Sequence, residues 1–100
     1  MQIFFQDKTP HEVISEIQEK LSNRKIGKIV FFELNGSNIH VKIKKAGTST
    51  LEFEHSHAEG GHKWTLSKEK IALTHRVFKS EVIGKIGKVI GDIGGTLEKS

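Results

Sequence analysis

The segment from Ile29 to Glu54 reads IVFFELNGSNIHVKIKKAGTSTLEFE and decides the fold class. Its central part, residues 39–44, alternates apolar and polar side chains with a period of two, as a half-buried strand requires. Asn35-Gly36 before it and residues 46–49 after it are rich in residues that favour tight turns. The segment therefore predicts an antiparallel meander with strands at about 25–34, 39–44 and 51–54.

The flanking sequence adds further elements to this meander. β-Branched and aromatic residues predict strands at 2–6, 63–66 and 71–78, with polar connections at 55–61 and 67–70; for 71–78 a helix is the alternative. An N-terminal helix at about 10–22 begins with a capping box of Thr9 and Glu12 around Pro10.

A C-terminal amphipathic helix is expected at about 80–93, ended by Gly94-Gly95. Together the elements predict an α+β fold in a single domain, residues 1–100, with a mostly antiparallel meander sheet of about five to six strands and two helices.

The composition excludes several classes of function. The 100 residues include no cysteine, so a disulfide scaffold, a cysteine-ligated zinc site and a thiol nucleophile are excluded. No apolar run is long enough for a transmembrane segment. No basic segment precedes a long apolar run at the N-terminus, so we expect no signal peptide. We therefore expect a cytoplasmic protein.

The net charge of +4 invites a nucleic-acid interpretation, but the distribution of charge along the chain argues against it. Sixteen basic residues are nearly matched by twelve acidic ones, and only two of the basic residues are arginine. In the predicted hairpin, Lys42 and Lys44 would lie opposite or diagonal to Glu52 and Glu54. We expect no sequence-specific binding of nucleic acid.

The C-terminal helix carries an unusual face of small residues. On a helical wheel Gly84, Gly87 and Gly91 form a strip, here called the glycine strip, beside an apolar arc that contains Ile83 and Ile90. Three glycines inside a helix cost about 1 kcal/mol each relative to alanine. Close approach of another backbone would offset that cost, and it predicts a binding surface for a protein partner or a second copy.

Two alternatives remain for this helix. It could be a loosely ordered surface helix that docks through its isoleucines alone. Contact with a membrane surface is disfavoured, because the helix has no Trp or Phe and its polar face carries both signs of charge.

A second candidate site is the histidine cluster, His55, His57 and His62. If the strand continues past Phe53, His55 and His57 point to one side, and a turn through Gly60-Gly61 returns His62 towards them. Three imidazoles with an open fourth position can bind Zn, Ni or Cu. The other histidines, at positions 11, 40 and 75, are isolated in the sequence, and we expect them to be exposed or hydrogen-bonded within the fold.

No catalytic residues are predicted, since the chain contains neither a nucleophile elbow nor a glycine-rich phosphate loop. The leading hypothesis is a non-enzymatic binding or adaptor module that acts through the C-terminal helix and needs no cofactor. The alternative is a small histidine-based metal-binding protein, or a metal-dependent hydrolase with Glu59 as its base.

Overall fold

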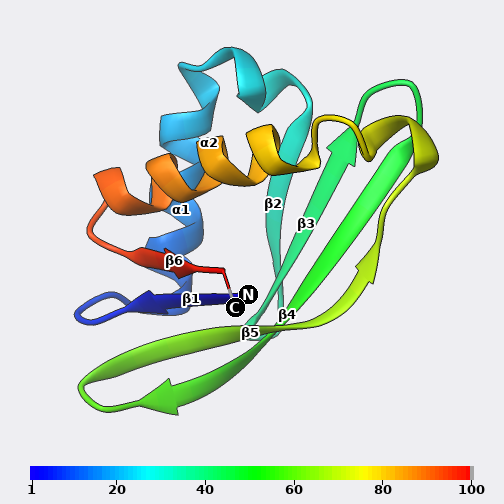
Figure 1. Cartoon of the computed structure of the whole chain (residues 1–100). Coiled ribbons are helices and arrows are strands. Elements are labelled where there is room, and N and C mark those ends of the chain that lie inside the picture. Colours follow the sequence, from blue (N-terminus) through cyan, green and yellow to red (C-terminus); the bar gives the residue numbers. More distant parts are fainter. Residues whose placement is uncertain (100) are drawn as a thin grey trace.

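The fold is seen in a computed structural model, which describes residues 1–99. Within these residues one antiparallel sheet has the strand order β2-β3-β4-β5-β1-β6 (Figure 1). The strands are β1 (Gln2–Phe5), β2 (Val30–Asn35), β3 (Asn38–Lys44), β4 (Thr48–Ala58), β5 (Gly61–Lys70) and β6 (Thr96–Glu98). The helices are α1 (Pro10–Ser22) and α2 (Lys79–Asp92), and two short 3-10 turns lie at η1 (Lys25–Lys28) and η2 (Leu73–His75). The α+β prediction is confirmed.

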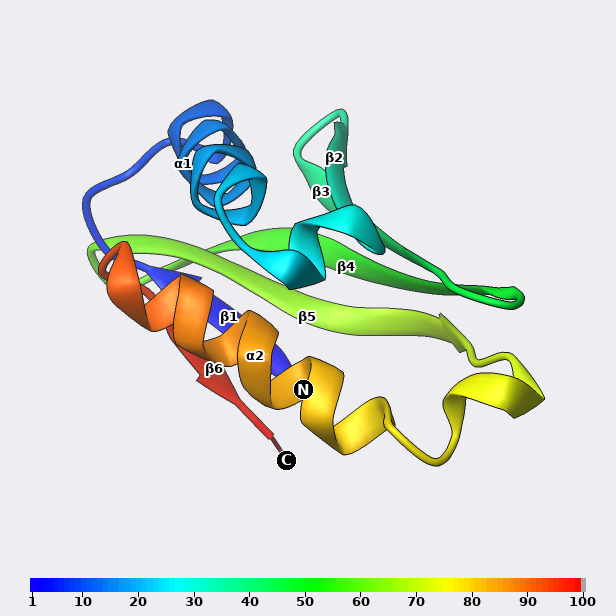
Figure 2. The ribbon, with the colours of Figure 1, turned by 90° about the horizontal axis from the view of Figure 1, so that it is seen from above.

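Both helices lie on the concave side of the sheet, which curves around them (Figures 1 and 2). α1 neighbours β2, and α2 neighbours β6 at the other edge. The alternating inward side chains of the strands meet the apolar faces of the helices in one core, at whose centre lie Phe53, Trp64 and Ile90. A register shift between β4 and β5 at Glu52/Phe53 interrupts the ladder, and such irregularities bend a strand.

The start of α1 follows the predicted chemistry. The backbone N–H of Glu12 donates to the Thr9 hydroxyl (3.2 Å), and the Thr9 N–H donates to the Glu12 carboxylate (3.1 Å). Pro10 occupies the first helical turn, where its missing N–H costs nothing. The buried residues Val13, Ile14, Ile17 and Leu21 then recur at helical spacing and face the core.

The first hairpin is present, but its turn lies one residue later than predicted. Asn35 pairs with Asn38 as the last residues of the two strands, so Gly36 and Ser37 form the turn. Gly36 has φ +64°, and glycine at the first turn position matches the twist of a two-residue hairpin.

The following hairpin also differs in register. Its loop is Lys45–Gly47, so Lys42 faces Thr50 rather than a glutamate. Lys42 forms an ion pair of 3.5 Å with Glu33 on β2. Glu52 lies diagonal to Lys42, as one of the predicted arrangements has it, but neither lysine lies directly opposite a glutamate of β4.

The connection between β5 and α2 corrects the sequence prediction in two places. Residues 67–70, expected as a turn, belong to β5, because the long strand β4 offers them pairing partners as far as Thr50. Residues 71–78, expected as a strand, form an irregular connection with the turn η2. Their alternation does not reflect a buried face, since Leu73 is 75% and Val77 is 92% exposed.

The C-terminal helix is confirmed, and a short strand follows it that the sequence did not predict. Gly94 adopts φ +94°, and the N–H of Gly95 donates to the carbonyl of Ile90 (2.9 Å), which ends the helix. The chain then reverses into β6, where Leu97 pairs with Ile3 of β1.

Candidate metal centre

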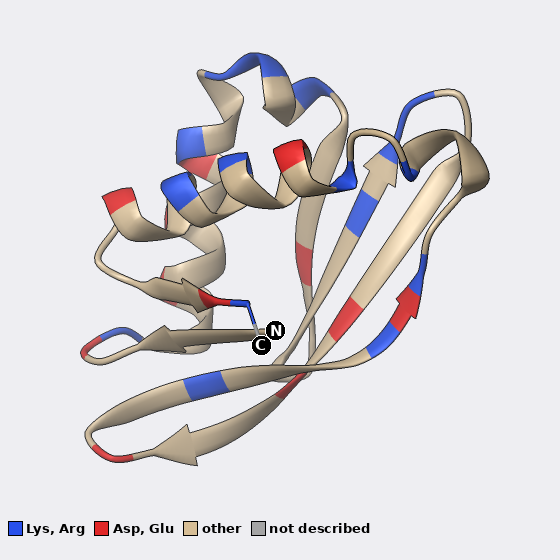
Figure 3. Ribbon diagram, in the orientation of Figure 1, with Lys and Arg blue, Asp and Glu red and all other residues tan. Residues whose placement is uncertain are grey.

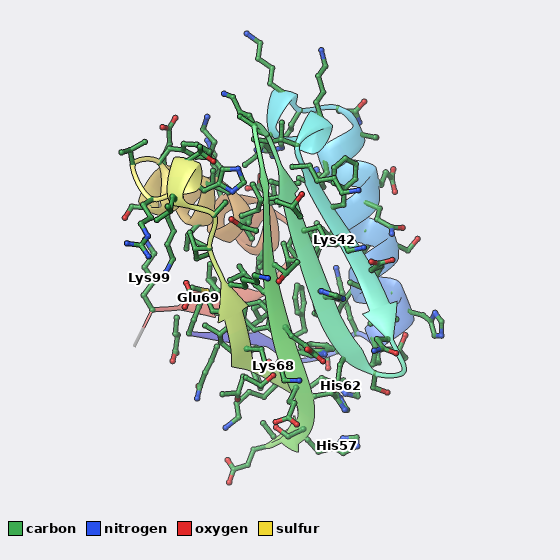
Figure 4. The ribbon with its side chains drawn as sticks, turned by 90° about the vertical axis from the view of Figure 1, so that its right-hand side faces the viewer. Lys42, His57, His62, Lys68, Glu69 and Lys99 are labelled. Atoms are coloured by element: carbon green, nitrogen blue, oxygen red, sulfur yellow. The ribbon has the colours of Figure 1, made fainter. Side chains whose placement is uncertain are left out.

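The histidine cluster lies at the free end of the β4–β5 hairpin. β4 extends to Ala58, the turn is Glu59-Gly60, and Gly60 takes φ +72°, a conformation that favours glycine. His57 faces His62 directly across the ladder, and His55 faces Trp64. Figure 4 shows His57 and His62 together at the end of the sheet where β4 turns into β5. The expectation that a glycine turn brings the three histidines to one side is confirmed.

The three imidazole rings form a compact triangle. Ring centroids are 5.1 Å apart for His55 and His57, 5.0 Å for His55 and His62, and 5.3 Å for His57 and His62. His55 Nε2 and His62 Nδ1 share a hydrogen bond of 2.7 Å. One nitrogen from each ring can be chosen so that all three lie within 4.8 Å of one another.

The core supports this triangle from below. Trp64 is fully buried, and its ring lies 5.3 Å from that of His55 and 6.0 Å from that of His62. The indole N–H donates to the carbonyl of Ser37 (2.8 Å), and the backbone N–H of His55 donates to the side-chain carbonyl of Asn38 (2.9 Å). These bonds tie the backbone of His55 and the indole of Trp64 to the β2–β3 turn and to the start of β3.

The surroundings of His55 favour its neutral form, which is the form that binds a metal ion. Burial lowers the pKa of His55, and the nearby charges of His62 and then His57 lower that pKa further. A metal ion binds the neutral form of imidazole, so a lowered pKa favours coordination at neutral pH. No carboxylate belongs to the cluster among residues 1–99, and Glu59 lies exposed in the turn.

The arrangement fits an ion after a small adjustment. A tetrahedral Zn²⁺ with Zn–N bonds of about 2.0–2.1 Å holds its nitrogen ligands about 3.3 Å apart. The hydrogen-bonded pair is already close to that separation, and its shared proton must leave when both nitrogens bind an ion. His57 is exposed, so its ring is free to rotate inwards. Solvent reaches the remaining coordination position.

The predicted partner-binding residues lie in two different environments. Gly84 and Gly91 are exposed, and among the described residues no atom outside the helix lies within 4 Å of a Cβ built at either position. At Gly87 the nearest such atom is Leu97 Cδ2, at 3.2 Å, so a side chain rather than a backbone covers the middle of the glycine strip. Ile83 and Ile90 are buried in the core of this chain. A partner would therefore reach the glycines and not the isoleucines.

A buried polar pair, Ser49 and His75, was missed by sequence reasoning because 26 residues separate its members. The Ser49 hydroxyl lies 2.5 Å from His75 Nδ1 and accepts from the backbone N–H of Ala72 (2.8 Å). His75 Nε2 lies 2.6 Å from the carbonyl of Lys45, which can only accept. Nε2 therefore carries the ring proton, and Nδ1 accepts from the serine. Both side chains are inaccessible to solvent, so the pair joins the β3–β4 loop to the β5–α2 connection.

No protein-family model, curated protein or solved structure matches this chain. Among residues 1–99, neither helix has the length and apolar character that crossing a membrane requires. The functional assignment therefore rests on the chemistry of the sites themselves.

Proposed function

We propose that the protein binds a divalent transition-metal ion, of the Zn²⁺, Ni²⁺ or Cu²⁺ class, through His55, His57 and His62. The single observation that supports this function is the convergence of three imidazole nitrogens within 4.8 Å at a solvent-accessible end of the sheet. Imidazole is the ligand type that these three ions share. The protein acts by binding rather than by catalysis, and we place it in the cytoplasm.

Two features of the cluster favour binding over a chance meeting of histidines. The ligands stand on adjacent strands of one hairpin, so little conformational entropy is lost when they close on an ion. Burial and the charges of His62 and His57 lower the pKa of His55, which favours the neutral imidazole that a metal ion binds.

Trp64 provides the test. It is the only tryptophan in the sequence and lies beside two of the proposed ligands, so Cu²⁺ or Ni²⁺ at the cluster should quench its fluorescence. We expect saturable quenching at one ion per chain, with a matching heat in calorimetry. His57→Ala should abolish both signals, whereas His11→Ala, which removes an exposed histidine on α1, should leave them unchanged. Equal binding by the wild type and His57→Ala would refute the function.

A second candidate function is contact with a protein partner or a second copy through the glycine strip. The observation that favours it is the open surface at Gly84 and Gly91, where glycine weakens the helix and no contact with the rest of residues 1–99 requires it. Substitution of these two glycines separates this function from a merely exposed surface.

A further inference from the structure

A groove with basic walls runs along α2, between this helix and the corner where α1 meets η1. It consists of two adjoining hollows of about 360 Å³ each, which share Lys25, Ile26 and Lys85 as lining residues. One end of the groove is formed by Lys45 in the β3–β4 loop and by Phe78. Here we call this feature the basic groove.

Cations from three separate segments line the basic groove, together with the carboxylate of Glu81. They are Arg24, Lys25, Lys28, Lys45, Lys85 and Lys88, six of the sixteen basic residues of the chain. Figure 3 shows the blue segments of η1, the β3–β4 loop and α2 at the same side of the molecule. The basic residues are dispersed along the sequence, but the fold gathers more than a third of them around one groove.

Acidic residues neutralise only part of this charge. Arg24 forms an ion pair of 2.5 Å with Asp92, and Lys85 forms one of 3.2 Å with Glu81. Within residues 1–99 no carboxylate lies within ion-pair distance of the other four lysines. The positive charges around the groove repel one another, and an anionic partner would reduce this electrostatic repulsion.

The floor of the basic groove is apolar. Ile26 and Val82 form its buried part, while Ile29 and Phe78 remain partly exposed. An apolar floor between rows of cations matches a ligand that carries apolar side chains on one face and carboxylates beside them.

We propose that the basic groove binds an acidic, amphipathic segment of a partner protein. Nucleic acid fits less well, because Arg24 is already engaged by Asp92 and the lysines lack the planar fork with which arginine recognises phosphates in fixed geometry. Stacking of bases on Phe78 is hindered, since Lys45 lies over that ring and His75 packs beside it. An anionic membrane also fits less well, because the apolar residues form the floor of a hollow and do not protrude.

This binding function is independent of the metal site and of the glycine strip. The histidine cluster lies at the tip of the β4–β5 hairpin, and the groove is lined by η1, the β3–β4 loop and the charged edge of α2. The lining of the groove contains none of the three glycines, although Lys88 lies one helical turn from Gly84, so the groove and the glycine strip adjoin on α2 without sharing a residue.

The test uses the full chain and a synthetic peptide in which leucines recur at helical spacing among glutamates. Fluorescence anisotropy of the labelled peptide should show saturable binding, weakened by at least about tenfold when salt rises from about 0.05 to about 0.2 M. The double variant Lys25→Glu/Lys85→Glu should also lose at least about tenfold in affinity, equivalent to about 1.4 kcal/mol or more. Lys68→Glu/Lys70→Glu changes the net charge equally at exposed positions of β5 and should bind like the wild type.

Three comparisons decide the outcome. A peptide with serine in place of leucine should bind more weakly, because the apolar floor then gains nothing. Equal loss in the two charge-reversal variants would mean general charge attraction and would overturn the assignment of the groove. Tighter binding of a DNA oligonucleotide or of anionic vesicles than of the leucine peptide, or no saturable peptide binding, would overturn the choice of partner.

Discussion

Alanine in place of Gly84 and Gly91 should stabilise the monomeric protein. Gly84 lies in the interior of α2 and Gly91 in its last turn, and a methyl group at either has open space around it among the described residues. Alanine restricts the unfolded chain more than glycine does and favours the helix by about 0.8–1 kcal/mol per site. The two positions are seven residues apart, about 10 Å along the helix, so the effects should add to at most about 1.6–2 kcal/mol.

Thermal unfolding followed by circular dichroism measures this effect. A domain of about this size gains about 4–8 °C in Tm per kcal/mol, so the double variant should melt about 6–16 °C higher than the wild type. Gly36→Ala is the matched control, because it also has open space but sits at φ +64°. A left-handed backbone costs a non-glycine residue about 1–2 kcal/mol, so this control should lower Tm.

The Tm should also be measured over a range of protein concentrations, with light scattering to give the molecular mass. These two measurements identify what covers the glycine strip. A lower Tm for Gly84→Ala/Gly91→Ala in a protein with monomer mass, at every concentration, would refute the reasoning. A decrease that appears only where the wild type forms a dimer would mean that the methyl groups disrupt an interface, in favour of the second candidate function.

Three further predictions concern other parts of the fold. The pKa of His55 is lower in the folded than in the unfolded chain, so without metal the unfolding free energy should fall as the pH drops below about 6.5. Urea titrations at several pH values should show a smaller fall for His55→Asn than for the wild type, and an equal fall would contradict this cause. His75→Ala leaves the buried Ser49 hydroxyl without its acceptor and should cost about 1–3 kcal/mol. Ser49→Ala removes the same bond and also the acceptor of the Ala72 N–H, so the double variant should lose less than the sum of the two single losses; additive losses in a double-mutant cycle would disprove the coupling. Gly95→Ala places a methyl carbon 2.4 Å from the buried ring of Phe5, so it should lower the free energy of unfolding, measured in urea, by about 1–3 kcal/mol or more. Unchanged stability would show that the turn after α2 can shift freely.

Local sequence signals predicted the elements whose causes are themselves local. The capping box at Thr9, the alternation in residues 39–44 and the glycines after residue 93 act within a few residues of chain, and the structure places elements there. The prediction of residues 67–78 failed because their conformation depends on a distant strand. β4 extends the ladder to Lys70, and of the alternating apolar residues after it Leu73 and Val77 are exposed to solvent.

The same division holds for the sites. The histidine cluster could be predicted because a strand alternates with period two and a short turn reverses it, so three residues within eight positions must meet. The basic groove and the Ser49–His75 pair could not, since their members come from segments far apart in the chain. Only the packing of α2 against the curved sheet brings those segments together, because the core that drives this packing involves every element at once.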